Sequence, residues 1–529
     1  MTSAPTPSTR SHWPVWLGLG LAALLGLAWW WSAGRPVQLP DAPSARIACV
    51  SYAPYHREGQ TPFDPATFIS PQQIDADLKA LSRRFDCVRT YSQGQGLDAV
   101  PAIAARYGMK VLMGVWIGRD PAANAREIAL AAATARAHPQ VLRGVIVGNE
   151  VLLRGEQSSA ALAGYLHQAR AVLPPAVPIT YADVWEFWLR HPELAGSVDY
   201  ITVHVLPYWE DDPVPPERAV RHVADVYARV RAAFPGKPVM IGETGWPSAG
   251  RPRQGATASL VNEARYLREF LRYAATVQMP YNVIEAFDQG WKRAQEGTVG
   301  GYWGIFDAQA QPKFPMQGPV TEVPRWWLGW LAAALGGGLF VLAGRPRGRR
   351  AAGALALAGI ASGAALAWQV RQMLYACGPL WEWLLSGAAC AVALVTALML
   401  ARTLAAVVQG VGATSLSRRW RFGWLFVLAY YGLLLVFDGR YRDFPLGLFE
   451  LPAVGYALVA LAGVAPDGAR RREEVFLAAA VLLLAAIVLV QERGLSPVAW
   501  LWLGLNALLG LAVLLPPRRS AHQQHGAEQ

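Results

Sequence analysis

Long apolar runs occupy two regions of this chain, and a segment of mixed polar and apolar residues lies between them. One almost uncharged run covers 15–33, and seven more follow from Trp326 onward. The seven lie at about 326–343, 351–370, 380–401, 422–437, 445–465, 475–491 and 497–515. Each approaches the roughly 20 residues that cross the hydrocarbon core of a bilayer. The pattern therefore predicts eight membrane-spanning helices, one before the mixed segment and seven after it.

The first apolar run predicts an anchor that stays on the protein. It is too long for the core of a signal peptide, and its end, Trp31-Ser32-Ala33, lacks the small-x-small pattern of a cleavage site. We expect four regions: a cytoplasmic tail and transmembrane anchor at 1–34, an extracytoplasmic domain at 35–324, a seven-helix membrane domain at 325–516 and a cytoplasmic tail at 517–529.

The placement of arginines predicts the orientation of the spans, because cytoplasmic loops carry the excess of Lys and Arg. Alternate connections hold Arg345, Arg347, Arg349, Arg350, Arg402, Arg418, Arg419, Arg421, Arg470, Arg471, Arg472, Arg518 and Arg519. Both termini are then cytoplasmic, and the mixed segment faces the periplasm from a multi-pass protein of the inner membrane. These arginines account for most of the net charge of +11, so we expect the lipid bilayer as a partner and no nucleic acid.

From Ile47 the mixed segment alternates short apolar runs with longer amphipathic stretches, which is typical of βα units around a parallel sheet. The short runs predict eight strands, at 47–52, 86–91, 110–116, 143–149, 177–182, 199–205, 237–243 and 281–287. Helices are expected at 71–83, 120–138, 158–173, 215–233 and 258–278. Eight such units suit one closed α/β barrel, the (β/α)8 TIM barrel, set between the N-terminal transmembrane helix and an all-α multispan membrane domain. The alternative, a doubly wound open sheet, would need a glycine-rich loop where Tyr52-Ala53-Pro54-Tyr55 stands.

Two of the predicted strands end in a glutamate. Val145–Asn149 leads into Glu150, and Lys237–Gly242 leads into Glu243. The C-terminal ends of parallel strands meet at one face of a barrel, so the two carboxyl groups can share a pocket. A facing pair of carboxyl groups is suited to glycosidic-bond chemistry. The alternative is that both are first-turn acids that a helix dipole stabilises.

Further polar and aromatic residues cluster where the predicted strands end, and sugars are bound by such ring faces and hydrogen-bonding groups. The candidates for substrate binding are Tyr52, Arg89, Tyr91, Asn149, Tyr181, Asp183, His204, Tyr208, Trp209, Trp246, Glu285, Asp288, Trp291 and Lys292. A structural role remains open for His204, Glu285 and Asp288, and core packing remains open for each tryptophan.

The segment from about 45 to 315 resembles glycoside hydrolase family 17, the β-1,3-glucanase and β-glucan transferase family, in a membrane-bound bacterial type. The matching pieces are Gly148-Asn149-Glu150, Gly242–Ser248, Val88–Tyr91 and Glu285–Asp288. The resemblance implies that Glu150 is the general acid/base, that Glu243 is the nucleophile and that anomeric configuration is retained. It also implies that Asn149 holds the sugar 2-hydroxyl, and we expect Arg89 to keep Glu243 ionised. The sequence departs from soluble relatives at Gln289–Lys292, where they have an acidic-proline pair, which leaves the aglycone-side contacts open.

We therefore expect a retaining enzyme that acts on β-1,3-linked glucan at the outer face of the membrane and transfers glucan to glucan, as in remodelling or branching. Tyr208, Trp209, Trp246 and the loop 289–292 would hold the acceptor sugar. The expected partners are a β-glucan oligo- or polysaccharide and a membrane glucan synthase.

Two other functions stay open. Within the enzyme class, the alternative is a membrane-tethered endo- or exo-β-1,3-glucanase. From another class, the chain would be a glucan-binding sensor or an exporter subunit. The candidate gate residues of an exporter are Asp438, Arg440, Arg442 and Asp443, for which a solvated loop is the plainer interpretation.

No cofactor and no metal are expected, because the sequence has no His-Glu-x-x-His, no Cys-x-x-Cys and no phosphate-binding loop. Cys49 and Cys87 fall in neighbouring predicted strands, where a bridge is one alternative. Strand parity points the two thiols to opposite faces, which favours buried free thiols. Cys377 and Cys390 belong to the predicted membrane domain.

Overall fold

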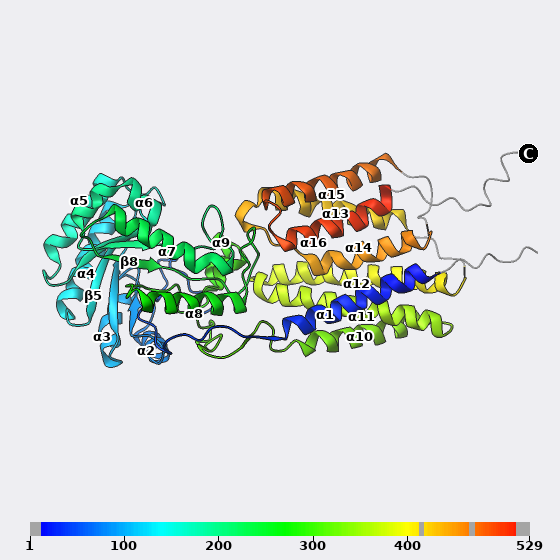
Figure 1. Ribbon diagram of the computed structural model, residues 1–529, viewed down its shortest axis with the longest axis horizontal. Helices are drawn as coiled ribbons and strands as arrows, with labels where there is room; N and C mark the ends of the chain where they lie inside the picture. Colours follow the sequence, from blue (N-terminus) through cyan, green and yellow to red (C-terminus); the bar gives the residue numbers. More distant parts are fainter. Residues whose placement is uncertain (1–11, 412–416, 465–470, 515–529) are drawn as a thin grey trace, which may run out of the picture. The chain divides into compact units, whose positions relative to one another are not determined.

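The computed structural model describes residues 12–411, 417–464 and 471–514. The chain divides into two compact units, Pro36–Val320 and a helical unit made of Met1–Arg35 and Thr321–Gln529. Figure 1 colours both along the sequence. The predicted C-terminal tail and the arginines Arg470, Arg518 and Arg519 lie outside the described residues.

A parallel sheet of seven strands forms the centre of the unit Pro36–Val320, and its strands follow one another in chain order. They are β2 (Val50–Ser51), β3 (Cys87–Arg89), β4 (Lys110–Val115), β5 (Leu142–Asn149), β6 (Ile179–Val184), β7 (Ile201–His204) and β8 (Val239–Glu243). Every neighbouring pair is parallel. A parallel sheet in this order with helical crossovers is the pattern predicted from the sequence.

The predicted eighth strand closes the sheet. Tyr281 forms a parallel bridge with Ile241 of β8, and Val283 forms one with Val50 of β2. The backbone N–H of Val283 donates to Cys49 O at 3.0 Å, and Val283 O accepts from Ser51 N at 2.9 Å. The segment is not a regular strand, because its amides then turn to other partners, such as Glu285 N to Trp303 O. The predicted (β/α)8 barrel is confirmed, with an irregular eighth strand position.

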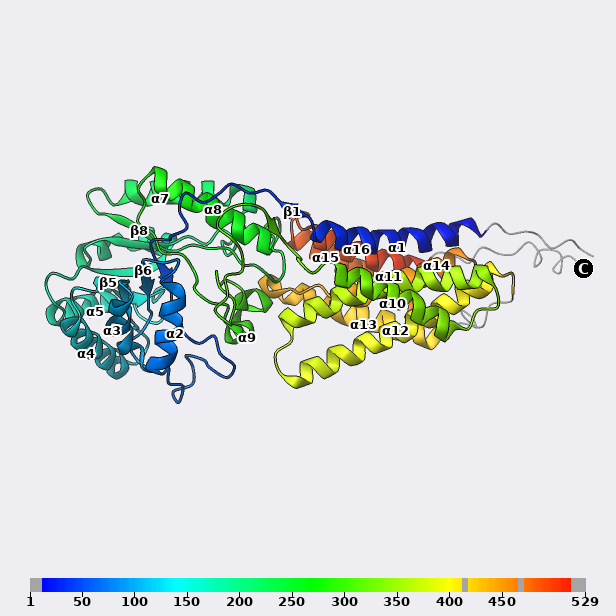
Figure 2. The ribbon, with the colours of Figure 1, turned by 90° about the horizontal axis from the view of Figure 1, so that it is seen from below.

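Helices cover the outside of the sheet (Figures 1 and 2). They are α2 (Pro71–Leu81), α3 (Val100–Arg106), α4 (Pro121–Ala137), α5 (Ser159–Val172), α6 (Trp185–Arg190), α7 (Pro216–Ala233) and α8 (Leu260–Thr276). The side chains of Ser70, Asp120 and Ser158 accept N-terminal amide hydrogens, as their positions predict for capping residues. The short helices α3 and α6 were not predicted. The connecting segments contain η1 (Leu97–Ala99), η2 (Pro192–Ser197), η3 (Gly290–Lys292), α9 (Arg293–Glu296) and η4 (Thr298–Gly301). The short strand β1 (Pro36–Val37) pairs with β9 (Val320–Thr321).

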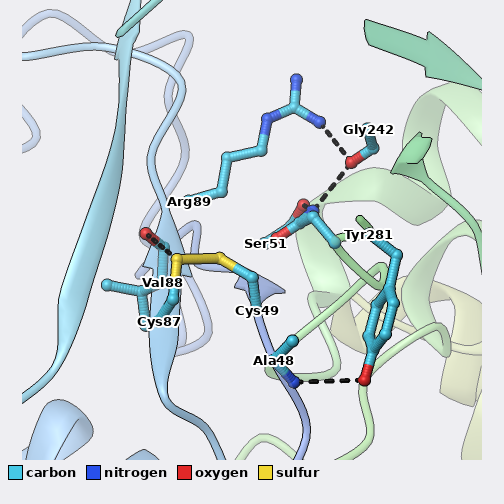
Figure 3. Close-up of a disulfide and its surroundings, with 9 residues drawn as sticks. Ala48, Cys49, Ser51, Cys87, Val88, Arg89, Gly242 and Tyr281 are labelled. Carbon is cyan, nitrogen blue, oxygen red and sulfur yellow. Dashed lines mark hydrogen bonds between the residues drawn. A yellow bond between two sulfur atoms is a disulfide. The ribbon is translucent and has the colours of Figure 1, made fainter. Parts of the chain in front are cut away.

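Cys49 and Cys87 form a disulfide, so the expectation of free thiols was wrong. The register pairs Val50 with Val88, which places Cys49 opposite Cys87, with both side chains on the same face of the sheet. Parity counted from the predicted strand ends missed this register. Figure 3 shows the bridge joining the two neighbouring strands, with Arg89 two residues farther along β3. Both cysteines are buried in a cluster with Leu112, Ile146, Ala182 and Met240.

The helical unit contains a helix for each predicted span. Among the described residues, seven of these helices are long and apolar enough to cross a membrane by length and composition: α1 (Trp13–Ala33), α10 (Trp327–Gly344), α11 (Arg349–Ala376), α12 (Leu380–Val408), α13 (Arg418–Phe437), α15 (Arg472–Gln491) and α16 (Pro497–Leu514). The eighth, α14 (Leu446–Leu461), is apolar but shorter and has Pro452 inside it. Figure 2 shows α1 beside α10 and α11, which it contacts.

Buried arginines and glutamates pair between different segments of this unit. Arg421 of α13 lies 2.7 Å from Glu474 of α15, and Arg442 lies 2.5 Å from Glu492. Arg442 is 5% exposed, so the expectation of a solvated residue at this position was wrong. Buried arginines need such partners, because an unpaired charge is costly to remove from water.

Candidate active site

Glu150 lies in the turn that follows β5. Its φ of 51° is in the left-handed region, which few non-glycine residues adopt. Gly148, two residues earlier, has φ 84°, and a Cβ there would come within 2.9 Å of Val151 Cγ2. This backbone places the Glu150 carboxyl group at the C-terminal end of the barrel, and its side chain is 23% exposed.

Glu243 is the last residue of β8, and Arg89 at the end of β3 and Tyr91 just after that strand supply its hydrogen-bond donors. Arg89 Nη1 donates to Glu243 Oε1 at 3.1 Å, and Tyr91 Oη donates to the same oxygen at 2.8 Å. Arg89 also donates through Nη2 to Asn149 Oδ1 at 2.5 Å and through Nη1 to Gly242 O at 2.8 Å. Because Arg89 is fully buried, its positive charge acts on Glu243 with little screening by water.

His204, at the end of β7, lies between the two glutamates. Its Nδ1 is 3.0 Å from Glu150 Oε1, and its Nε2 is 3.7 Å from Glu243 Oε1. One carboxylate oxygen of each glutamate and a ring nitrogen of His204 all lie within 4.8 Å of one another. These three groups could ligate a cation by distance alone. Arg89 Nη1, however, is 3.4 Å from His204 Nε2 and 3.1 Å from Glu243 Oε1, so a positive charge already lies beside them.

The surroundings of Glu150 act on its pKa in opposite directions. Burial raises the pKa, while the hydrogen bond and charge of His204, with the charges of Arg154 and Arg89, lower it. The net direction is below the ordinary value for a glutamate. Without substrate, Glu150 is therefore stabilised as a carboxylate that His204 holds in place.

Tyr181 and Asp183 of β6 support the turn that carries Glu150. Asp183 Oδ2 accepts from the backbone N–H of Leu152 at 3.3 Å and also from the Tyr181 hydroxyl. The Tyr181 oxygen in turn accepts from Leu152 N at 3.0 Å. Burial raises the pKa of Asp183 to about 6. Both side chains are buried behind the turn, so the structure places them beneath Glu150.

Several predicted sugar-binding residues have their polar atoms engaged inside the protein. The Tyr52 hydroxyl donates to Asp77 at 2.9 Å, Tyr208 donates to Arg251 O at 2.5 Å, and Trp246 Nε1 donates to Thr257 O at 3.0 Å. All three side chains are at most 1% exposed. Trp209 is only partly buried and stacks on Trp303, with ring centroids 6.3 Å apart.

The irregular eighth strand and the loop that follows it carry a buried charge cluster. Lys292 Nζ lies 2.8 Å from both oxygens of Glu285, and Lys313 Nζ lies 2.9 Å from Asp288 Oδ1. Burial raises the pKa of Glu285 to about 7, although Lys292 opposes the shift. Glu285 also accepts from Gln289, whose Oε1 accepts from Trp291 Nε1 at 2.8 Å. The predicted residues Glu285, Trp291 and Lys292 thus belong to one connected group.

Sequence reasoning missed residues that the fold brings to the same region. Burial raises the pKa of Glu296 in α9, with the negative charges of Glu150 and Glu243 contributing. Ser51 Oγ lies 2.9 Å from Tyr91 Oη, to which it can donate, and accepts from Asn282 Nδ2 at 2.8 Å. Glu296 follows no predicted strand, and a serine inside a strand carries no signal. Its spacing of four residues from Lys292, which places the two on one face of a helical turn, was the one pattern that could have indicated that Glu296 joins this group.

Comparison with known proteins finds glycoside hydrolases and a glucan transferase. Residues 49–304 match the family model of the BtgE/BtgC glycoside hydrolase domain. The chain is 27% identical to "Probable beta-glucosidase btgE" of Aspergillus clavatus over 276 residues, which is 51% of this chain and 47% of that protein. It is also 27% identical to a "Glucan 1,3-beta-glucosidase" of Arthroderma benhamiae, over 46% of this chain and 83% of that protein.

Among solved structures, a Rhizomucor miehei β-1,3-glucanosyltransferase is 26% identical, with a TM-score of 0.45, and the match covers 51% of this chain and 97% of that one. The chain spans about half the length of the btgE relatives that it matches. The segment 49–304 matches the BtgE/BtgC glycoside hydrolase domain, and with these relatives it supports a GH17-like β-1,3-glucan family for this part of the chain.

Proposed function

We propose that the barrel is a retaining enzyme for β-1,3-linked glucan, with Glu243 as the nucleophile and Glu150 as the general acid/base. The observation that carries this proposal is the separation of the two carboxyl groups: an oxygen of Glu150 lies within 4.8 Å of an oxygen of Glu243. Retaining glycosidases need carboxyl groups about 5–5.5 Å apart, whereas inverting enzymes need about 6.5–9.5 Å to admit a water molecule.

The surroundings support a different role for each glutamate. Glu243 accepts hydrogen bonds from Arg89 and Tyr91, which stabilise an ionised carboxylate that can attack the anomeric carbon. Glu150 is more exposed, and among the residues that the structure describes only His204 lies within ion-pair distance of it. The group that protonates the leaving oxygen must exchange its proton during each cycle, which a partly exposed carboxyl beside an imidazole can do.

In the first step, the Glu243 carboxylate attacks the anomeric carbon while Glu150 gives its proton to the departing glycosidic oxygen, leaving a glycosyl ester on Glu243. In the second step, Glu150 takes a proton from the incoming hydroxyl group, which attacks the same carbon and releases Glu243. Substrate binding therefore has to shift the proton onto Glu150, because the empty site lowers its pKa. A sugar oxygen that displaces His204 from Glu150, or added burial, would have that effect.

We propose transfer to a second glucan chain as the main fate of the glycosyl ester. Tyr208 and Trp246 are buried, so the rings available to hold an acceptor are the partly buried Trp209 and Trp291. Phe63, 61% exposed, extends the Trp291 surface, with ring centroids 5.4 Å apart. An acceptor competes with water at about 55 M only when the site orients it, a proximity effect that can exceed that concentration.

Product analysis tests this choice. The full chain in detergent is incubated with β-1,3-gluco-oligosaccharides of one length, and product sizes and linkages are read by mass spectrometry and NMR. Products longer than the starting material, present early, support transfer. Shorter products alone would instead identify a membrane-tethered β-1,3-glucanase. Binding without turnover would favour a glucan sensor.

We also propose that the barrel works at the outer face of a bacterial inner membrane, beside a glucan synthase. Seven helices long and apolar enough to cross a membrane support a membrane location, and the alternating arginine-rich connections support external placement of the barrel. Single cysteines introduced near Arg347 and Gly155 can be labelled with an impermeant thiol reagent in intact cells. We expect labelling near Gly155 only, and labelling near Arg347 would reverse the orientation.

A further inference from the structure

A cavity within the helical unit is lined by one carboxylic acid among aliphatic side chains. Its volume is about 50 Å³, and α1, α11, α12 and α14 form its walls. The acid is Glu450, in the second turn of α14. The rest of the lining is Leu, Ala, Val, Gly and one serine, Ser362. A single ionisable side chain therefore faces a medium of low polarity.

Glu450 has no ion-pair or hydrogen-bond partner among the residues that the structure describes. Glu450 is partly exposed, whereas the buried carboxylates Glu474 and Glu492 each lie beside an arginine: Glu474 is 2.7 Å from Arg421, and Glu492 is 2.5 Å from Arg442. An ionised carboxylate without a partner is costly in such surroundings, and the group avoids the cost by keeping its proton. The contrast with Glu474 assigns a neutral acid to this position.

No charged group near the cavity changes this balance. Along their whole length, α1, α14 and α16 carry no charged residue other than Glu450. The charged residues of α11 and α12 are Arg349, Arg350, Arg371, Glu382 and Arg402, and none of them lines the cavity. On α13, which also contacts α14, Arg421 is paired with Glu474.

The cavity lies inside the helices that line it and not at their ends. It meets α1 at Leu19 and Ala22, whose helix begins at Trp13, so it lies about 9 Å or more inside that helix at 1.5 Å per residue. Two residues after Glu450, Pro452 interrupts the hydrogen bonding of α14, the shortest of the apolar helices. Ionisable residues inside apolar helices of a membrane protein, and helices interrupted near them, mark ion and proton sites.

We propose that Glu450 is a proton-binding site of the helical unit, a carboxylic acid that holds its proton at neutral pH and exchanges it within this cavity. A proton fits better than a metal cation. The lining supplies two side-chain oxygen groups, the Glu450 carboxyl and the Ser362 hydroxyl, whereas Ca²⁺ takes about six to eight oxygen ligands and Mg²⁺ an octahedral set.

Infrared difference spectroscopy tests the proposal directly on the full chain in lipid nanodiscs. The spectrum of Glu450→Gln is subtracted from that of the unmodified protein at pH 7. We expect the C=O stretching band of a protonated carboxylic acid, which disappears as the pH is raised well above neutral. The matched control is Glu474→Gln, whose difference spectrum should contain the bands of an ionised carboxylate.

A difference spectrum for Glu450→Gln that contains only carboxylate bands at pH 7 would overturn the proposal. A second readout is modification by the hydrophobic reagent dicyclohexylcarbodiimide, in which the carboxylic O–H adds across a C=N bond and the adduct rearranges to an N-acylurea. Peptide mass spectrometry should find the adduct on Glu450 and not on Glu474. Labelling of Glu474 in preference to Glu450 would contradict the assignment. The glycosidase activity of Glu450→Gln should be unchanged.

Discussion

Arg89 and Glu243 form an ion pair of 3.1 Å at the C-terminal end of the barrel, and the arginine side chain of this pair is fully buried. The guanidinium group also donates to Asn149 Oδ1, the residue before Glu150. One fixed cation therefore connects the strand ends that carry the two glutamates. Arginine suits this position because its planar fork can hold two acceptors at once.

Replacing Arg89 with lysine should lower kcat/KM by roughly 10²–10³, because an ammonium group cannot hold both Glu243 and Asn149 in place. The measurement is steady-state kinetics on a β-1,3-gluco-oligosaccharide. Arg46→Lys is the matched control, since Arg46 pairs with Asp86 on the surface and its side chain is 50% exposed. If Arg89→Lys keeps more than half of the activity, the pair does not position the nucleophile.

Exchanging each glutamate for glutamine should separate their roles. Glu243→Gln should abolish turnover of every donor, because no glycosyl ester can form. Glu150→Gln should retain glycosylation from donors whose leaving group needs no proton, such as a dinitrophenyl glycoside. The comparison is the rate on an activated donor divided by the rate on the oligosaccharide. The same ratio in both variants would reject the proposed division of roles.

Asp183 should make folding stability depend on pH. Its pKa is raised from 3.8 to about 6 in the folded protein, so between these values the folded state holds a proton that the unfolded state has lost. Stability should therefore fall as the pH rises from about 4 to 6, by on the order of 3 kcal/mol. Urea unfolding at several pH values measures the slope.

Asp183→Asn should remove that slope. Its stability should also be lower at every pH, because the asparagine amide group cannot accept both the Val184 N–H and the bonds from Tyr181 and Leu152. An unchanged slope in this variant would mean that another group titrates.

The Cys49–Cys87 disulfide should stabilise the barrel by about 2–4 kcal/mol, since it closes a loop between residues 38 positions apart. Thermal unfolding with and without a reductant measures this contribution. The double variant Cys49→Ser/Cys87→Ser should be less stable and insensitive to the reductant. A Tm for the unmodified protein that does not respond to reductant, even when reduced from the unfolded state, would contradict the prediction.

The sequence predicted the barrel and its two glutamates because both depend on local patterns. A buried strand followed by an acid is visible at Asn149-Glu150 and again at Gly242-Glu243. The disulfide depended on the register between two strands, which differs by one position from strand ends judged by composition. A slip of one residue reverses the face of every side chain.

Burial was the harder property to predict within the site. Tyr52, Tyr208 and Trp246 stand at strand ends, where aromatic rings can either face a ligand or fill the barrel mouth. Which of these occurs depends on loops such as 288–304, in which the Gly304 N–H donates to the Asp288 side chain at 2.9 Å. These contacts join residues that are distant in the sequence and have no local pattern.

The stereochemistry of the first product tests the central claim most directly. Proton NMR of a fresh reaction on a β-1,3-gluco-oligosaccharide resolves the anomer that is released or formed before mutarotation. Two successive displacements through a glycosyl ester on Glu243 predict the β-anomer, or a new β-linkage when the acceptor is a sugar. Release of the α-anomer would show a single displacement by water and would contradict the assignment of Glu243 as a nucleophile.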